Sequence, residues 1–157
     1  MSRNGPTPSQ CALKYLGFRS RTELEVRHKL TASGFSEEEI KATLEELKSH
    51  NLLNDETLAR DWTQLKTLER GYGPLFVEQE LHRRGVATAI IERIIFETFG
   101  EGQEVTRAAE IVGRQFEETD LTDIKMLKRV EALLIRRGYN RSVIATVLPE
   151  NAHEAWD

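Results

Sequence analysis

The side chains best suited to chemistry in this chain are cations gathered near its C-terminal end. Segment 125–141 holds six basic residues against one acid, Glu131, although the chain as a whole has a formal net charge of −4. The six are Lys125, Lys128, Arg129, Arg136, Arg137 and Arg141. A cluster of this sign can bind the phosphates of a nucleic acid or the carboxylates of a protein partner. Arg83 and Arg84 form a smaller basic pair in the middle of the chain.

The same cations also have a purely structural interpretation. The pairs 83–84 and 136–137 each come directly before a glycine that is expected to end a helix. Cations near a helix C-terminus stabilise it by about 0.3–1 kcal/mol each. Partner binding and helix-end stabilisation therefore both stay open, and all eight basic residues named above are candidate partner-binding residues.

Catalytic chemistry finds little support in the sequence. The histidines are His28, His50, His82 and His153, and none lies at a metal-ligand spacing from another ligand. Cys11 has no histidine in its predicted helix to activate it. Segment 71–74, Gly-Tyr-Gly-Pro, lacks the lysine of a phosphate-binding loop, and its proline removes a backbone donor. We therefore expect no enzyme activity, no catalytic residue, no metal site and no cofactor.

The elements that must position the cations repeat three times along the chain. Each repeat has a valine, a leucine and a glycine spaced four residues apart: Val26, Leu30 and Gly34; Val77, Leu81 and Gly85; Val130, Leu134 and Gly138. Residues at this spacing share one helix face, so each valine and leucine should be buried. Each glycine suits the left-handed residue that follows a helix end. Repetition at about fifty residues indicates stacked supersecondary units with an extended surface for a large partner.

Local signals divide each unit into three helices. Ser36 and Glu39 form a capping box, Pro74 after Gly73 suits the first helical position, and Asp55 can cap the helix that begins there. The predicted helices span 9–18, 21–33 and 36–50, then 55–70, 74–84 and 87–99, then 103–117, 122–137 and 140–148.

The chain is therefore predicted to be all-α, with three tandem three-helix repeats stacked into an elongated, curved molecule. Run 89–96 is rich in β-branched residues, but its apolar pairs recur at helical spacing, which favours a helix. The predicted segments are a flexible N-terminus (1–8), repeats at 9–54, 55–100 and 101–148, and a flexible tail (149–157). No apolar run could cross a membrane, no signal peptide is apparent, and the single cysteine fits a reducing compartment, so we expect a cytoplasmic monomer.

A helix-turn-helix DNA reader is a less favoured interpretation of these helix pairs. In that motif the second helix enters the major groove. Here the helix after the first glycine begins with three consecutive acids, Glu37, Glu38 and Glu39, and its counterpart in the second unit is nearly neutral. Repulsion from DNA phosphates would oppose insertion of such helices.

Short segments spread over about 11–148 match the pattern of a known family. They are 12–13, 21–24, 30–35, 53–55 with 58–59, 71–74, 80–86, and 134–139 with Ile144. On these segments the chain resembles the RecX family of bacterial regulators of the RecA recombinase. The specific feature is Gly-Tyr-Gly-Pro at 71–74 followed by Leu81 and Gly85 within three matching units. Segment 75–77 departs from the family, which often has a basic residue and isoleucine there.

The resemblance implies an all-α molecule of three tandem three-helix units that binds within the groove of the RecA–DNA filament. It further implies inhibition of the ATPase, strand-exchange and co-protease activities of RecA, with no enzymatic activity of the chain's own. The RecA filament would be the protein partner, with DNA as a second contact and no membrane involved. Two other classes stay open: a helical protein that acts on DNA directly, and an unrelated helical adaptor.

Overall fold

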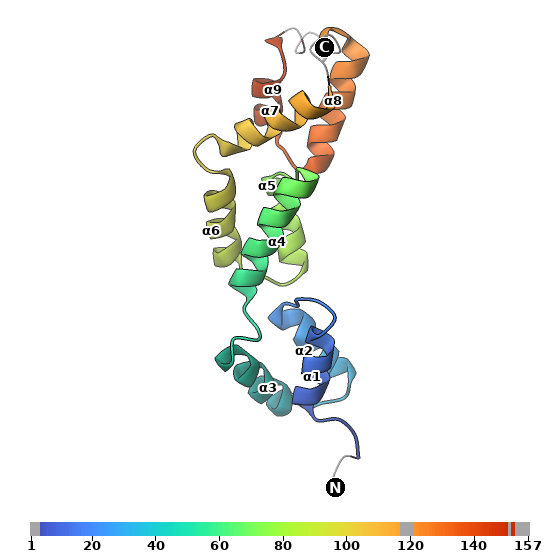
Figure 1. Cartoon of the computed structure of the whole chain (residues 1–157), viewed down its shortest axis with the longest axis vertical. Coiled ribbons are helices and arrows are strands. Elements are labelled where there is room, and N and C mark those ends of the chain that lie inside the picture. Colours follow the sequence, from blue (N-terminus) through green and yellow to red (C-terminus); the bar gives the residue numbers. More distant parts are fainter. Residues whose placement is uncertain (1–3, 117–120, 151, 153–157) are drawn as a thin grey trace.

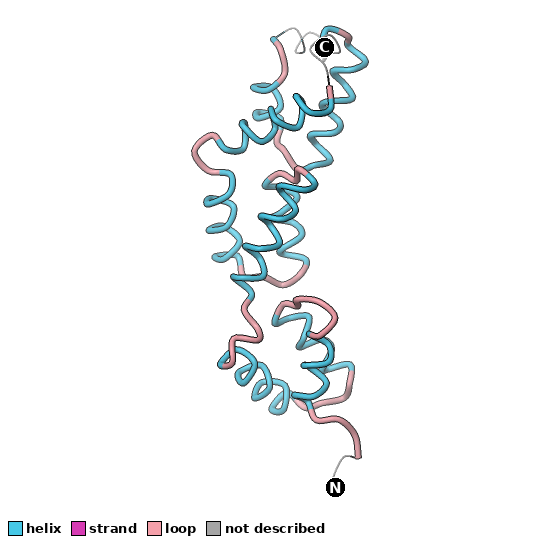
Figure 2. Tube along the Cα trace, viewed as in Figure 1, coloured by secondary structure: helices cyan, strands magenta, loops and turns pink. Residues whose placement is uncertain are grey.

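The computed structural model describes residues 4–116, 121–150 and 152, and these residues form nine α-helices and no strand (Figure 2). The helices are α1 (Pro8–Leu16), α2 (Glu23–Ala32), α3 (Glu37–Ser49), α4 (Asp55–Arg70), α5 (Pro74–Arg83), α6 (Thr88–Phe99), α7 (Gln103–Gln115), α8 (Ile124–Arg137) and α9 (Arg141–Val147). The predicted all-α class is confirmed. Run 89–96 lies within α6, so its β-branched residues do form a helix.

The helices gather in threes along the long axis of the molecule, α1–α3 at one end, α4–α6 in the middle and α7–α9 at the other end (Figure 1). The stack is elongated and gently bowed in this view. Each group has its own hydrophobic core rather than a share of one large core. All six repeat residues predicted to be buried are 0 % exposed: Val26, Leu30, Val77, Leu81, Val130 and Leu134.

Most of the predicted helix starts are confirmed in detail. The Ser36 hydroxyl accepts from the Glu39 amide at 3.2 Å, and the Glu39 carboxylate accepts from the Ser36 amide at 2.8 Å, which completes the capping box. Pro74 is the first residue of α5, with Gly73 as its N-cap. The predicted helices are longer than the observed ones mainly because they include cap residues.

The prediction that Asp55 caps α4 is wrong. The N-cap is Asn54, whose side-chain oxygen accepts from the Thr57 amide at 3.0 Å, and Asp55 is already the first helical residue. The Asp55 carboxylate instead accepts a hydrogen bond from the Glu23 amide at 2.9 Å. The side chain therefore links α4 to the first turn of α2. Burial is the main reason that the pKa of Asp55 is raised.

The repeat helices α2, α5 and α8 meet end to end. The hydroxyl of Thr22, the N-cap of α2, donates to the backbone carbonyl oxygen of Arg84 at 2.6 Å. At the next joint the amide of Gly73, the N-cap of α5, donates to the carbonyl oxygen of Arg137 at 2.6 Å. Thr22 and Gly73 hold equivalent places in their repeats, as do Arg84 and Arg137. The same kind of joint therefore connects successive units.

Two of the three repeat glycines, Gly85 and Gly138, lie at these joints. Gly34, Gly85 and Gly138 have φ of 83°, 84° and 92°, which confirms the predicted left-handed conformation. A Cβ at Gly85 would overlap the Leu24 side chain, and a Cβ at Gly138 would overlap the backbone of Phe76. These two glycines thus end a helix, and because they lack a side chain the first turn of the neighbouring repeat helix can pack against them.

Most of the predicted flexible termini, 1–8 and 149–157, lies outside the described residues. Of the described positions, Pro8 begins α1, and Ala152 is fully buried in the core of the third unit. Among the described residues, no helix is long and apolar enough to cross a membrane.

Candidate partner-binding surface

Four of the predicted binding residues lie together on one side of α8: Lys125, Lys128, Arg129 and Arg136, here called the α8 cation face. Asp123 starts this helix by accepting a hydrogen bond from the Lys125 amide at 3.1 Å. On the opposite side of the helix, Val130 and Leu134 are buried in the core. Lys125, Arg129 and Arg136 are four and seven residues apart, a spacing that returns to one helix face. All four cations are therefore exposed.

Within the described part of the chain, the α8 cation face carries charge that no acidic side chain neutralises. Within residues 4–116 and 121–150, no ion pair joins any of its four cations to an acid. The Arg129 guanidinium lies 3.9 Å from the sulfur of Met126, a weak contact. These side chains can therefore meet external phosphates or carboxylates without first breaking an ion pair of this kind.

Two exposed isoleucines on α8 were missed by the sequence-based reasoning. Ile124 is 55 % exposed and Ile135 is 45 % exposed. They lie four residues before and seven residues after Lys128, so all three follow one helical stripe. The available signal was that both isoleucines fall out of phase with the buried stripe of Val130 and Leu134. Apolar side chains beside cations are typical of a protein interface.

The other two cations of segment 125–141 lie apart from this face. Arg137 is half-buried at the joint between the second and third units, with its guanidinium carbon 5.8 Å from the centre of the Tyr72 ring. That ring stacks on Phe76 at 3.9 Å between ring centres. Arg141 is exposed and opens α9.

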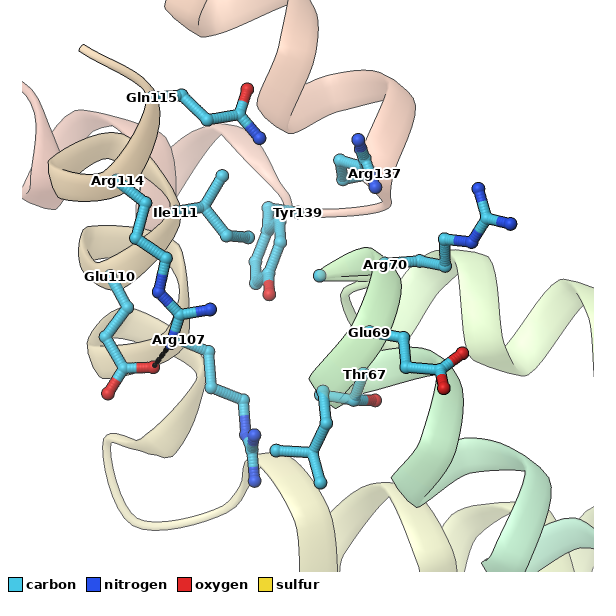
Figure 3. Close-up of a pocket in the computed structure, with 12 residues that line it drawn as sticks. Thr67, Glu69, Arg70, Arg107, Glu110, Ile111, Arg114, Gln115, Arg137 and Tyr139 are labelled. Atoms are coloured by element: carbon cyan, nitrogen blue, oxygen red, sulfur yellow. Dashed lines mark ion pairs between the residues drawn. The ribbon is translucent and has the colours of Figure 1, made fainter.

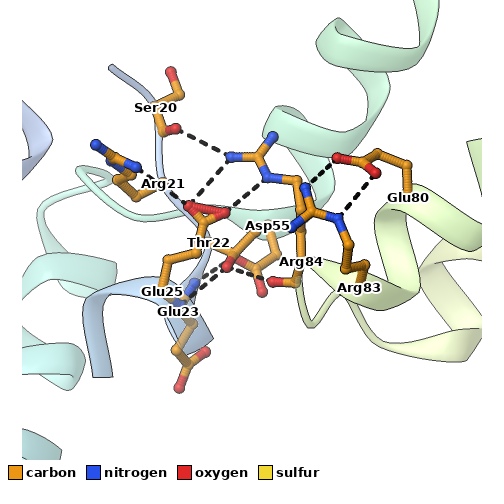
Figure 4. Close-up of polar contacts among 9 residues, drawn as sticks. All are labelled: Ser20, Arg21, Thr22, Glu23, Glu25, Asp55, Glu80, Arg83 and Arg84. Atoms are coloured by element: carbon orange, nitrogen blue, oxygen red, sulfur yellow. Dashed lines mark hydrogen bonds and ion pairs between the residues drawn. The ribbon is translucent and has the colours of Figure 1, made fainter. Parts of the chain in front are cut away.

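The pair of arginines at the end of α5 divides between two roles (Figure 4). Arg84 reaches back to the first unit, where its Nε donates to Oε1 of Glu25 at 2.7 Å and its Nη2 to the carbonyl oxygen of Ser20 at 3.3 Å. The Arg84 and Glu25 side chains are only 11 % and 18 % exposed. The prediction that Arg84 is a partner-binding residue does not fit this position, because its planar guanidinium is held inside the joint by the Glu25 carboxylate.

Arg83 points outward and remains a candidate. Its Nε donates to Oε2 of Glu80 at 3.0 Å, and a second guanidinium nitrogen contacts the other carboxylate oxygen. This hydrogen bonding lowers the pKa of Glu80. Since an acid already neutralises Arg83, it offers a partner less free charge than the α8 cation face.

The described residues include no group of three or more histidine, cysteine, aspartate or glutamate side chains arranged to hold a metal ion. The chemistry available at the α8 surface is reversible ionic, hydrogen-bonding and apolar contact. Such a surface suits a binding protein.

Comparisons with known proteins match the three-helix units of the chain. The family model for the first three-helix domain of RecX matches residues 10–47, and that for the second matches residues 54–94. The regulatory protein RecX of Trichlorobacter lovleyi is 32% identical over 142 residues, covering 87% of this chain and 92% of that protein. That of Mycobacterium sp. strain KMS is 29% identical over 162 residues, covering 94% and 88%.

Solved structures show the same fold. The crystal structure of RecX from Lactobacillus salivarius superposes with a TM-score of 0.77 at 19% identity, covering 94% of this chain and 95% of that one. A second crystal structure of a regulatory protein RecX gives a TM-score of 0.68 at 21% identity, covering 89% and 69%. From the matched domains, the near full-length relatives and the shared nine-helix architecture of the described residues, the chain belongs to the RecX family of non-enzymatic regulatory proteins.

Proposed function

We propose that this protein is a negative regulator of RecA. It binds the RecA–DNA filament and inhibits the ATPase, strand-exchange and co-protease activities of RecA. The observation that carries the proposal is family membership over nearly the full chain, and the curated relatives are regulatory proteins RecX. We further propose that it acts as a monomer in the cytoplasm.

The shape and surface of the molecule support a filament as the partner. Three units joined end to end form an elongated body, which suits contact with several neighbouring subunits at once. Linking weak contacts on one rigid body raises the overall affinity without requiring any single strong site. The α8 cation face, with Ile124 and Ile135 beside it, would provide one of these contacts.

The direct test is the ATPase activity of RecA on single-stranded DNA, titrated with the full chain. We expect inhibition at amounts of protein near or below the amount of RecA. Co-sedimentation of the protein with RecA filaments, but not with RecA lacking DNA, should accompany the inhibition. Full ATPase activity at stoichiometric amounts of protein, with no co-sedimentation, would contradict the proposal.

A second candidate is a helical protein that acts on DNA directly, and the unpaired charge on α8 favours it. In that case the protein should bind a single-stranded oligonucleotide in the absence of RecA. Binding should weaken steeply with salt, because each phosphate contact releases counterions. Tight, salt-sensitive binding to DNA combined with no effect of RecA on that binding would favour this alternative.

A further inference from the structure

A cavity of ≈ 270 Å³ lies between the second and third units (Figure 3). One wall is the C-terminal end of α4, including Thr67 and Arg70. The other wall is α7, including Arg107 and Ile111, together with Tyr139 from the turn after α8. The cavity is thus built from segments far apart in sequence, and neither unit forms it alone.

The cavity contains a hydroxyl group that the fold leaves unsatisfied. Tyr139 is 2 % exposed, and among the described residues its hydroxyl has no hydrogen-bond partner. Figure 3 shows this oxygen directed into the space between Arg107 and Thr67. The Thr67 hydroxyl is likewise buried and has no partner among the described residues. A buried polar group without a hydrogen-bond partner destabilises the folded state, so two such groups beside one cavity call for an explanation.

The protonation state of Tyr139 makes its hydroxyl a donor. Burial is the main reason that the pKa of this group is raised, to about 12. The hydroxyl therefore keeps its proton at neutral pH and can donate to an acceptor placed in the cavity. The positive charges of Arg107 and Arg137 act in the opposite direction and lower this pKa. The negative charges of Glu104 and Glu110 raise it, so charges of both signs act on the hydroxyl.

The lining is positively charged although the chain as a whole is acidic. It includes four arginines and two acids: Arg70, Arg107, Arg114 and Arg137 with Glu69 and Glu110. One of the acids, Glu110, is 3.8 Å from the Arg114 guanidinium, so that arginine is partly neutralised. Arg107 donates through Nε to the carbonyl oxygen of Thr98 at 3.3 Å, which fixes its side chain against the end of α6. Its guanidinium carbon lies 5.8 Å from the centre of the Phe99 ring, and no hydrogen bond within the described residues engages its terminal nitrogens.

We propose that this cavity is a binding site for a phosphate group, either free or carried by a nucleotide or a nucleic-acid backbone. The available donors are hydroxyl and guanidinium groups, which match the several acceptor oxygens of a phosphate better than the two oxygens of a carboxylate. The side chains that carry the site are Tyr139, Thr67 and Arg107. It stands independently of the proposed action on RecA.

A bound phosphate would tie the second unit to the third, because α4 contributes one wall and α7 the other. A ligand that binds only the folded arrangement stabilises it by mass action. Binding should therefore raise the unfolding temperature of the full chain, a result that needs no RecA. It should also shift the NMR signals of residues that line the cavity, including Gly71 and Tyr139.

The experiment titrates the full chain with inorganic phosphate and, separately, with a short single-stranded oligonucleotide, at fixed ionic strength. The variants are Tyr139→Phe, which removes only the unpaired hydroxyl, and Arg107→Gln. The matched control is Arg19→Gln, the same change at an exposed position in the first unit. We expect phosphate to shift signals at the cavity and raise the unfolding temperature. Arg107→Gln should weaken binding about tenfold, the loss of one charge-assisted hydrogen bond.

The two sources of phosphate separate in the same experiment. Tighter binding of the oligonucleotide than of phosphate, with the same loss in both variants, would identify a nucleic-acid backbone. Binding of phosphate alone would identify a small ligand. The proposal is overturned if no cavity signals move at millimolar phosphate, or if acetate binds as well as phosphate. Equal binding by the wild type, Tyr139→Phe and Arg107→Gln would also overturn it.

Discussion

The Thr22 hydroxyl donates a hydrogen bond to the backbone carbonyl oxygen of Arg84 at 2.6 Å, across 62 residues of sequence. Arg84 is the C-cap of α5, where carbonyl groups lack partners within the helix. At the next joint the backbone amide of Gly73 donates a hydrogen bond to the carbonyl oxygen of Arg137. At each joint, a backbone carbonyl group at a helix end therefore receives a hydrogen bond from the N-cap residue of the neighbouring unit. The repeat motif thus specifies both the fold of a unit and the way units connect.

The repeat glycines should differ in how well they tolerate alanine. At Gly34 the change should cost about 1–2 kcal/mol, the penalty for a side chain in the left-handed region, because no described atom beyond its chain neighbours lies within 4 Å of the added Cβ. Gly85→Ala and Gly138→Ala should cost clearly more, since the new carbon overlaps Leu24 or Phe76. Thermal and urea unfolding of the three variants provide the comparison. Equal losses in all three would contradict the packing described at the joints.

The buried repeat leucines should be far more sensitive to truncation than exposed ones. Leu81 is 0 % exposed in the core of the second unit, so Leu81→Ala should cost about 2–5 kcal/mol. Leu65, on α4 of the same unit, is 50 % exposed, and Leu65→Ala should change stability by about 0.5 kcal/mol or less. Urea unfolding of both variants tests the assignment. A small effect at Leu81 would mean that the repeat stripe does not form the core.

The sequence was sufficient to predict features set by local spacing. The stripe of Val26 and Leu30, the capping box at Ser36 and the first-turn proline at Pro74 all follow from helix geometry within a few residues. The same period placed the α8 cation face opposite Val130. These features depend on residues that are close together in the sequence, so a periodic pattern in the sequence is enough to predict them.

Features that depend on distant parts of the chain could not be predicted in this way. Arg84 looked like a helix-end cation, and nothing within its helix indicated a partner 59 residues away at Glu25. Asn54 and Asp55 are both good capping residues, and the local sequence does not show that the Asp55 carboxylate accepts a hydrogen bond from the distant Glu23 amide. The Tyr139 hydroxyl has no hydrogen-bond partner among the described residues because of how two units pack, and the sequence of one repeat does not indicate that packing.

The ion pair between Arg84 and Glu25 should show strong energetic coupling. Both side chains are largely buried, so removing either one leaves a charge with poor access to water. We expect Arg84→Gln and Glu25→Gln each to destabilise the protein by about 1–3 kcal/mol, and the double variant to cost less than the sum. Urea unfolding of the four proteins completes the cycle. Additive losses would show that the contact in Figure 4 contributes no pairwise stabilisation.

Alkaline pH should test the environment of Tyr139. Its pKa is about 12 in the folded protein, above the ordinary value of 10.0, because burial disfavours the phenolate. Well below pH 10.0 the hydroxyl is protonated in both states, so its titration costs no stability there. As pH rises from 10.0 towards about 12, the unfolded chain loses the proton first, and stability falls.

Tyr139→Phe removes this dependence and also removes an unpaired buried hydroxyl. The variant should be at least as stable as the wild type at neutral pH without ligand. The free energy of unfolding of the variant should exceed that of the wild type by a growing amount as pH rises above 10.0. Urea unfolding of both proteins across this range isolates the contribution of the hydroxyl, since other titrating groups are shared. Parallel curves would indicate that the hydroxyl is as accessible to water as in the unfolded chain.

Charge reversal on the α8 cation face should relieve inhibition of RecA without unfolding the protein. Arg129→Glu with Arg136→Glu changes two exposed side chains and leaves Val130 and Leu134 in the core. The cost in stability should not exceed about 1 kcal/mol, mainly from an acid near a helix C-terminus. We expect the concentration for half-inhibition of the RecA ATPase to rise at least about tenfold, the equivalent of about 1.4 kcal/mol.

The matched control places the same charge change elsewhere on the molecule. Lys14→Glu with Lys41→Glu alters two exposed lysines of the first unit, so the net charge falls equally. If general repulsion from DNA were the cause, both double variants would lose inhibition to the same extent. Loss confined to the α8 variant would assign the effect to that surface.

Salt dependence then separates the two possible targets of these cations. If Arg129 and Arg136 meet DNA phosphates, removing each contact should flatten the logarithmic salt slope of binding by about 0.7–0.9. If they meet acidic side chains of RecA, the slope is shallow from the start and DNA alone binds weakly. We expect the second outcome. Ile124 and Ile135 place exposed apolar surface beside the cations. A protein partner can bury this surface against its own apolar side chains, whereas phosphate groups cannot. A folded α8 variant that inhibits as well as the wild type would leave these cations with a role in stabilising the helix alone.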